Sequence, residues 1–278
     1  MQHVLSTHLF ANHRLTTWCL DRIWDSGIPA VEIFCARQHL DYNNRAQIGE
    51  LAAWFRDAEL KLHSIHAPMY NDEYWGRSGP QAVVDITEPV KTKRIAMVDE
   101  IKRALEMAES IPFRYMIQHL GVAGQEYDER RIDAGFDSLD ELSNFARARG
   151  VEVLLENTPN SLSSAERLVG FLIQTHLKLG FCLDVGHANM NEGVEAAYRL
   201  MADRIRSTHL HDNDGKEDQH LFPTMNHGGT IDWKRTVTTL RSRPDQYPLV
   251  LELKEVPEYG PHPFDKAAAI FENLENLQ

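Results

Sequence analysis

The chain has 278 residues, of which 42% are apolar and 25% are charged, and its net charge is −12. This length and composition predict a single domain over residues 1–278 with a sizeable core. The acidic balance disfavours a broad surface for nucleic acid, which needs clustered Lys and Arg, although it does not exclude a nucleic-acid substrate.

Short apolar runs alternate with amphipathic patterns along the whole chain. We expect strands near residues 3–9, 30–35, 60–66, 115–120, 151–156, 180–184, 205–211 and 248–254. The helical patterns between and after them lie near residues 15–26, 44–59, 93–110, 129–149, 163–175, 194–203, 232–241 and 265–276. Apolar runs of this kind are typical of parallel strands buried on both faces, and eight strand–helix units predict closure. The predicted fold is therefore α/β, as a single (β/α)8 TIM barrel.

Two of the expected connections, residues 67–92 and 212–232, are longer than usual. Each leaves the C-terminal end of a strand, so each should overhang the mouth at which the active sites of such barrels form. The first contains Tyr70 and Trp75. Long ordered loops at this end commonly hold substrate, and we expect both connections to do so. The alternative for each is a surface excursion with no role.

Six of the expected strands end in a side chain that can bind a metal ion. These residues are His66, His119, Glu156, Asp184, His209 and Glu252. Because the C-terminal ends of barrel strands converge on one mouth, the pattern predicts a divalent metal centre there. We expect the ion to be Zn²⁺, Mn²⁺, Co²⁺ or Mg²⁺, since imidazoles and carboxylates together suit several metals.

The carboxylate candidates have competing interpretations. Glu156 and Glu252 lie in otherwise apolar strands, where a lone carboxylate is costly to bury unless a salt bridge or a metal ion compensates it. Asp184 and His187 form a D-x-x-H pattern that lets both reach one site, although Asp184 could instead cap a helix.

The histidine candidates are less certain individually, because a single histidine is more often a packed core residue than a ligand. Strand periodicity does not choose between His209 and His211. Asp218 and His220 form a D-x-H pair in the second long connection, where the alternative is a solvated acidic loop.

Cys19, Cys35 and Cys182 are far apart and form no C-x-x-C pair. We therefore expect buried thiols in a reducing compartment rather than a disulfide framework. The N-terminal segment has no basic region followed by a long apolar stretch, and no run approaches the roughly 18 apolar residues of a membrane span. These features predict a cytoplasmic protein with no membrane partner, and they leave a homo-oligomer open.

Taken together, these motifs resemble the xylose-isomerase-like barrel superfamily, which includes sugar epimerases, inosose-processing enzymes and apurinic-site endonucleases. The resemblance covers essentially the whole chain and rests on seven segments, namely His66–Pro68, His119–Gly121, Leu155–Thr158, Asp184–His187, His209–Asp212, Asp218–His220 and Leu251–Glu252.

The resemblance implies a ligand set for each branch of the superfamily. As in the sugar-acting members, one divalent ion would be held by Glu156, Asp184, His209 and Glu252. As in the endonucleases, up to three zinc ions would be bound, with Glu156 shared between two of them. The additional ligands would be His66 and His119 for one ion, and His187, Asp218 and His220 for another.

The activity that we expect is a metal-dependent isomerase or epimerase acting on a small sugar, sugar phosphate or polyol through an enediolate. Glu156 and Glu252 would transfer the proton, and His187 would bind a substrate oxygen. Tyr70, Trp75 or Phe10 could stack on the apolar face of the ring. One ion is the favoured number and three is the upper limit.

Two other enzyme classes and a non-catalytic barrel remain alternatives. The first is a zinc-dependent phosphodiesterase of the apurinic-site endonuclease type, and the second is an inosose-type dehydratase. Residues 223–229 depart from the Gly-Glu-Gly that commonly follows the D-x-H pair in the superfamily. No arginine-rich loop suited to bent duplex DNA is evident, and neither is the arginine that sugar epimerases place after the seventh strand.

Overall fold

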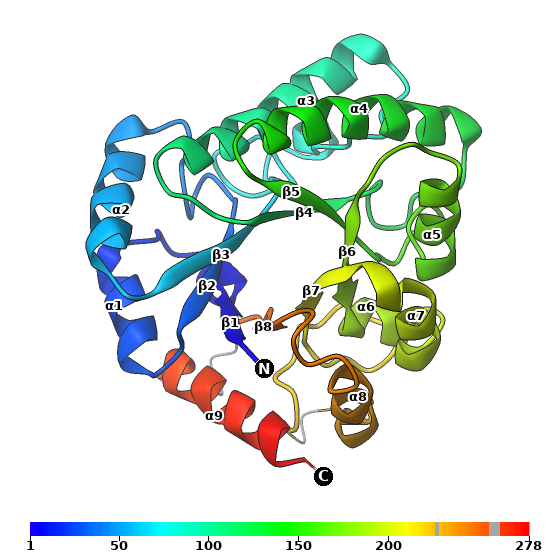
Figure 1. Cartoon of the computed structure of the whole chain (residues 1–278). Coiled ribbons are helices and arrows are strands. Elements are labelled where there is room, and N and C mark those ends of the chain that lie inside the picture. The colour runs from blue at the N-terminus through cyan, green and yellow to red at the C-terminus, as the bar shows by residue number, and fades with distance from the viewer. Residues whose placement is uncertain (226–227, 256–261, 278) are drawn as a thin grey trace.

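The computed structural model describes residues 1–225, 228–255 and 262–277. Eight parallel strands form one sheet in the order β7-β6-β5-β4-β3-β2-β1-β8. Their bounds are β1 His3–Ser6, β2 Ala30–Phe34, β3 Lys61–His66, β4 Tyr115–His119, β5 Glu152–Glu156, β6 Gly180–Asp184, β7 Ile205–His209 and β8 Leu249–Leu251. A parallel bridge between Leu210 and Leu251 links the two ends of the sheet, so the predicted (β/α)8 barrel is confirmed (Figure 1).

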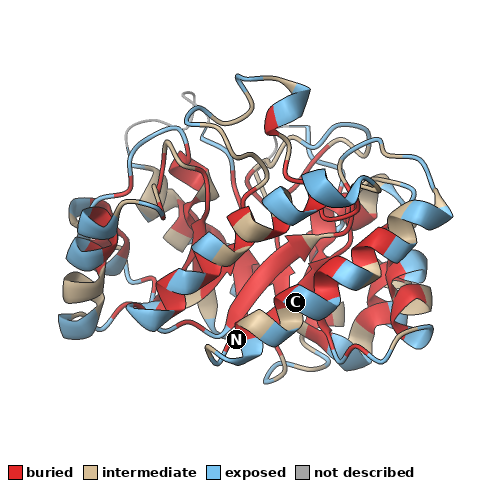
Figure 2. Cartoon of the chain, turned by 90° about the horizontal axis from the view of Figure 1, so that it is seen from above, coloured by how far each residue is buried: buried red, intermediate tan, exposed pale blue. Residues whose placement is uncertain are grey.

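Helices surround the barrel on its outside (Figure 1). They are α1 Thr17–Asp25, α2 Arg45–Asp57, α3 Lys91–Leu105, α4 Glu129–Arg147, α5 Ala165–Ile173, α6 Val185–Met190, α7 Val194–Met201, α8 Trp233–Leu240 and α9 Pro263–Asn276. Short 3-10 turns cover Thr7–Phe10, Pro80–Ala82, Glu106–Glu109 and Ala202–Arg204. Figure 2 shows buried strands at the centre and exposed residues on the outer faces of the helices.

The strands are buried because both of their faces are covered. Every residue of β2 and β6 is buried. The apolar runs in the sequence predicted this burial, which is typical of strands in a parallel sheet. Inward-facing and outward-facing side chains alternate along each strand, so one polar residue in an apolar strand can enter the barrel without disturbing the packing of the helices. The charged residues Glu32 and Asp184 are buried in this way.

Several elements differ from the sequence expectations; β7 and β8, expected to reach residues 211 and 254, end at His209 and Leu251. The first strand, expected to reach residue 9, ends at Ser6, whose hydroxyl accepts a hydrogen bond from the backbone of His8 and starts the turn Thr7–Phe10. The helix expected to extend to residue 110 tightens into a 3-10 turn after Leu105. The short helix α6 was not among the expected helices, and it begins immediately after β6.

Both long connections are held by hydrogen bonds of their own. In the first, Tyr70 and Val83 form an antiparallel bridge, and the backbone N–H of Val84 donates to the carbonyl of Met69. In the second, Asp212 and Leu221 exchange both of their backbone hydrogen bonds. The connections are therefore ordered where they leave the barrel. Among the described residues, no helix is both long and apolar enough to cross a membrane.

Candidate metal centre

Side chains at the strand ends and in the segments that follow them converge at the mouth of the barrel in three clusters. Within each cluster, one potential ligand atom from every residue lies within 4.8 Å of the others. Cluster 1 is His66, His119 and Glu156; cluster 2 is Glu156, Asp184, His209 and Glu252; and cluster 3 is His187, His211, Asp218 and His220. All nine residues expected as ligands are therefore in a cluster, and Glu156 belongs to two of them.

Cluster 1 brings two imidazole nitrogens and a carboxylate oxygen together. Nε2 of His119 lies 3.2 Å from Nε2 of His66 and 3.0 Å from Oε2 of Glu156. Nδ1 of His66 is 2.9 Å from the carbonyl of Ala67, so it carries the proton and leaves a lone pair on Nε2. Ligand atoms around a tetrahedral zinc ion are roughly 3.3 Å apart, so these spacings fit a shared cation.

Cluster 2 is centred on Nδ1 of His209. This nitrogen lies 3.1 Å from Oε1 of Glu156, 3.4 Å from Oε2 of Glu252 and 3.8 Å from Oδ2 of Asp184. All four side chains are buried. Three carboxylates around one imidazole are an oxygen-rich donor set that suits a divalent ion.

Asp184 caps a helix, as one of its two interpretations predicted, and its role as a metal ligand stays a prediction. Its Oδ1 accepts the backbone N–H of His187 at 2.6 Å, in the first turn of α6. Its Oδ2 faces cluster 2 and lies 3.2 Å from Nε2 of His211. The cap holds the carboxylate in place and positions α6, which carries His187, beside the mouth.

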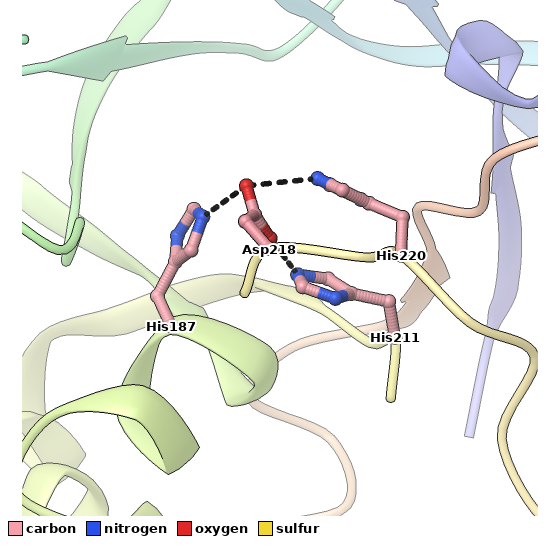
Figure 3. A group of neighbouring side chains, drawn as sticks. All are labelled: His187, His211, Asp218 and His220. Carbon is pink, nitrogen blue, oxygen red and sulfur yellow. Dashed lines mark hydrogen bonds and ion pairs between the residues drawn. The ribbon is translucent and has the colours of Figure 1, made fainter. Parts of the chain in front are cut away.

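Cluster 3 gathers three imidazoles around one carboxylate (Figure 3). Oδ2 of Asp218 lies 3.3 Å from Nε2 of His187 and 3.2 Å from Nε2 of His220, and Oδ1 lies 3.7 Å from Nε2 of His211. Nδ1 of His187 is 3.0 Å from the carbonyl of Asn157, and Nδ1 of His220 is 2.9 Å from that of Glu252. A second hydrogen bond of this type is usual for histidines that bind metal ions.

The backbone of His220 is strained in a way that fits a functional position. Its φ angle is +49°, in the left-handed region that favours glycine. Such strain persists only where the surrounding contacts hold the residue. Here Nδ1 of His220 is bonded to the carbonyl of Glu252, and the ring is stacked on that of His211 at 3.9 Å.

His211 differs from the other histidines of cluster 3. It is fully buried, and its Nε2 can donate to Asp184, but its Nδ1 has no hydrogen-bond partner. A metal-bound Nε2 would leave an unpaired N–H at Nδ1, which is costly to bury. This geometry favours His211 as a donor that links Asp184 to cluster 3 over a role as a ligand.

The electrostatics of the mouth stabilise positive charge. In the part of the chain that the structure describes, every ion pair of the five buried or half-buried carboxylates here is to a histidine; these carboxylates are Glu32, Glu156, Asp184, Asp218 and Glu252. Burial alone would raise the pKa of Glu156, but His209 and His119 hold it well below its usual value. Burial opposes the charged form of His220, yet Asp218 raises its pKa to about 9. Carboxylates that stabilise the protonated form of their histidine neighbours would also stabilise a metal cation.

The predicted substrate-binding residues fall into two groups. His187 and Tyr70 line a cavity of about 500 Å³ that also borders His66, His119 and Asp218. Trp75 is not among the residues that line this cavity, and it packs edge-on against Phe34 and His8. Phe10 packs in the core against Phe264, with ring centroids 5.3 Å apart, so it is placed as a packing residue rather than as a wall of the cavity.

Sequence reasoning missed Glu32, although it had a usable signal. Glu32 is a lone carboxylate in the apolar strand Ala30–Phe34, which is the same pattern that marked Glu156 and Glu252. Its position in the middle of the strand, rather than at its end, kept it out of the ligand set. His211 was left undecided, because its strand periodicity is that of His209. His227, a weaker candidate histidine in the second long connection, lies outside the described residues.

The family model described as xylose isomerase-like TIM barrel matches residues 20–277. A relative in Methanocaldococcus jannaschii, an uncharacterised protein, is 28% identical over 130 residues, which cover 46% of this chain and 51% of that protein. A probable endonuclease 4 of Natronomonas pharaonis is 27% identical over 150 residues, covering 49% and 53%. The matched regions thus span about half the length of these two relatives.

Solved structures match the fold over almost the whole chain. A D-tagatose 3-epimerase-like protein has a TM-score of 0.76 at 23% identity, with 99% of this chain and 97% of that chain covered. The IolI protein with a bound zinc atom has a TM-score of 0.73 at 17% identity, covering 99% and 96%. A probable 3-DHS dehydratase of Bacillus anthracis has a TM-score of 0.70 at 16% identity, with both chains fully covered.

Proposed function

The chain belongs to the xylose isomerase-like TIM barrel family, and on that premise we propose that it is a divalent-metal-dependent isomerase or epimerase acting on a sugar, sugar phosphate or polyol. One observation carries the proposal. Cluster 2 places two carboxylates, Glu156 and Glu252, within 3.4 Å of one imidazole nitrogen, at a mouth that borders a cavity of small-molecule size. A structural neighbour described as D-tagatose 3-epimerase-like supports the same class.

The residues of cluster 2 fit a resident divalent ion. Glu156, Asp184, His209 and Glu252 would hold it through three carboxylates and one imidazole, a donor set that suits Mn²⁺, Co²⁺, Zn²⁺ or Mg²⁺. Such an ion supplies Lewis-acid polarisation of a substrate carbonyl and stabilises the negative charge of an enediolate. The structural neighbour with a bound zinc atom is consistent with a metal in this fold.

Proton transfer falls to the two glutamates. Glu252 is only 3% exposed, and its Oε2 lies 3.4 Å from Nδ1 of His209 and 3.7 Å from Nδ1 of His220. In this position the carboxylate can take a proton from a carbon beside the carbonyl. Glu156 approaches His209 from another strand and could return the proton from the other side of the substrate. His119 donates to Oε2 of Glu156 and fixes the plane of that carboxylate.

A second candidate, phosphoester hydrolysis, is favoured by one specific observation. The two oxygens of Glu156 serve different clusters, since Oε1 faces His209 while Oε2 faces His119. An isomerase with one ion has no need of clusters 1 and 3. Three clustered ions would supply the charge stabilisation that phosphoester cleavage requires. The partial similarity to a probable endonuclease 4 points in the same direction.

Metal counting and three assays separate these candidates. We expect the purified protein to contain about one divalent ion and to catalyse deuterium exchange from solvent into one member of a panel of ketoses. Three tightly bound zinc ions together with nicking of duplex DNA at an abasic site would replace the isomerase by the nuclease. Loss of water from a ketose or cyclic ketone, seen by mass spectrometry, would identify a dehydratase. No exchange into any ketose with Mn²⁺, Co²⁺ or Mg²⁺ supplied would contradict the main proposal.

A further inference from the structure

We propose that Asp85 and Gln125 form a clasp that holds two walls of the substrate cavity at a fixed separation, and that both are positioning residues for substrate binding. The inference rests on the proposed function for its kinetic part. It goes beyond that function because neither residue lines the cavity or belongs to a cluster. The clasp acts on the affinity for substrate, whereas the clusters act on the chemical step.

The two walls belong to different connections of the barrel. The connection after β3 supplies Met69, Tyr70, Val83 and Val84, and the connection after β4 supplies residues 121–123. The first wall is held together by the bridge between Tyr70 and Val83 and by the bond from the N–H of Val84 to Met69. Bonds of this kind fix the shape of one wall, but they do not fix its distance from the other.

A buried carboxylate and one amide join the two walls. Asp85 is 7% exposed and directly follows Val84, and its Oδ2 accepts a hydrogen bond of 2.8 Å from Nε2 of Gln125. Oε1 of the same amide accepts the backbone N–H of Val122 at 3.1 Å. Two consecutive hydrogen bonds therefore connect the wall that contains Val84 to the wall that contains Val122.

The neighbours of the Gln125 amide allow only one orientation of it. An ionised Asp85 offers acceptors alone and the N–H of Val122 is a donor, so the NH₂ group faces the carboxylate and the carbonyl faces the N–H. The reversed amide would oppose both partners. The carboxylate of Asp85 thus controls the hydrogen bond of a backbone group that it does not touch.

The carboxylate is itself held firmly. Its Oδ1 accepts the backbone N–H of Thr87 at 2.8 Å and the Thr87 hydroxyl at 2.6 Å, and its Oδ2 lies 3.0 Å from Nη1 of Arg131 in α4. Because both groups of Thr87 donate to Oδ1, an asparagine at position 85 would place its NH₂ group at Oδ2. A Cβ at Gly121 would collide with Oε1 of Gln125, so the second wall packs directly against the amide.

Exchanging the amide and the carboxylate tests the clasp. Asp85→Asn sets an NH₂ group against the NH₂ group of Gln125, and Gln125→Glu sets two carboxylates against each other. The double variant Asp85→Asn/Gln125→Glu restores a donor facing an acceptor and keeps an acceptor for the N–H of Val122. The control is Asp137→Asn, which removes an ion pair of 3.1 Å with Arg94 elsewhere on α4.

Amide hydrogen exchange of the substrate-free protein, followed by NMR, measures the coupling of the walls. We expect the amides of Val84 and Val122 to exchange roughly fivefold faster or more in each single variant, and to return to within about twofold of the wild-type rates in the double variant. The amide of Leu155 in β5 should keep its rate throughout, which separates local release from general destabilisation. Asp137→Asn should change none of the three amides.

Kinetics of the metal-loaded protein supply the functional measurement. On the ketose into which the wild-type protein exchanges deuterium, we expect each single variant to raise KM roughly fivefold or more and to change kcat less than about twofold. The double variant should restore KM. A pair that only stabilised the fold would lower the amount of active protein, and hence the apparent kcat, while KM stayed the same.

Three results would overturn the inference. The first is an unchanged exchange rate of Val122 in folded Asp85→Asn, and the second is a double variant that behaves no better than the single ones. The third is a loss of kcat with KM unaltered. Amide exchange needs no substrate, so it is independent of the isomerase assay. Faster exchange at both walls with no deuterium exchange into any ketose would contradict the proposed reaction and leave the clasp established.

Discussion

Nε2 of His209 lies 3.1 Å from Oε1 of Glu32, and both side chains are completely buried inside the barrel. Glu32 also accepts a hydrogen bond of 2.7 Å from the hydroxyl of Ser64. The Glu32 carboxylate thus accepts a hydrogen bond from Nε2–H of His209, on the side of the ring away from cluster 2. The lone pair of Nδ1 is left facing Glu156. A carboxylate behind a ligand histidine fixes the orientation of the ring and raises its basicity.

We expect Glu32→Gln to weaken metal binding in cluster 2 by roughly 10- to 100-fold, because the amide keeps the shape but removes the charge behind His209. Competition with a chromophoric chelator measures the affinity. Glu152→Gln, which makes the same change at the opposite end of a barrel strand, is the control and should leave the affinity unaltered. Equal affinities for the two variants would rule out a supporting role for Glu32.

The two carboxylates Glu252 and Asp184 should respond differently to substitution. We expect Glu252→Gln to reduce deuterium exchange into the substrate by roughly 10²- to 10⁴-fold, since a general base is lost. It should weaken metal binding less than Asp184→Ala, because the amide oxygen of Gln can still coordinate. Metal content by plasma mass spectrometry and exchange by NMR are measured on the same samples. The reverse order of metal loss would argue against Glu252 as the base.

Stability should fall on mild acidification because of His39. Burial lowers its pKa to about 4 from the usual 6.5, and its ring is bonded to the carbonyl of His13 and the hydroxyl of Thr7. Between these two pH values the unfolded chain binds a proton that the folded protein does not. The stability is therefore complete above pH 6.5, and about 3 kcal/mol of it is lost as the pH falls to 4.

Urea unfolding between pH 7 and pH 4, in the presence of a chelator, measures this effect. His39→Gln should show a pH dependence that is shallower by about that amount. His176→Gln, which removes an exposed histidine, should retain the wild-type dependence. A wild-type slope in His39→Gln would show that other groups cause the acid sensitivity.

Two glycines in helices should give opposite results when replaced by alanine. The ring of His211 occupies the space that a Cβ of Gly186 would need, so Gly186→Ala should cost about 1–3 kcal/mol by displacing that ring. Gly170 in α5 has open space there, and Gly170→Ala should stabilise the protein by about 0.4–1 kcal/mol. The free energy of unfolding, measured for both variants and for the wild-type protein, tests these two expectations. A stabilised Gly186→Ala would mean that His211 is not held against α6.

The fold was predictable because its signals are local and repeated. Eight apolar runs alternated with helical patterns, and all eight strands formed near the expected positions. Boundaries were less predictable where side chains compete with the backbone. The hydroxyl of Ser6 turned the chain out of β1, and the carboxylate of Asp184 started α6 directly after β6. Such caps depend on rotamers that a hydrophobic pattern does not record.

The clustering of the ligand candidates could be predicted only to the level of a shared mouth. Their positions at strand ends predicted that His66, His119 and Glu252 lie at the same end of the barrel. No sequence pattern indicated that Glu156 would face two clusters. That arrangement depends on the stagger of neighbouring strands, which pairs Glu156 with His119 on β4 and with Cys182 on β6. The metal-binding roles of these residues stay a prediction until ions are measured.

The origin of cluster 3 has an evolutionary consequence. Clusters 1 and 2 are built almost entirely from strand ends, whereas Asp218 and His220 come from the connection that follows β7. Rewriting that one surface segment could remove or restore a whole cluster while every barrel strand stayed intact. Descendants of a common barrel could thus gain or lose a cation, and with it a type of chemistry, through changes in a single loop.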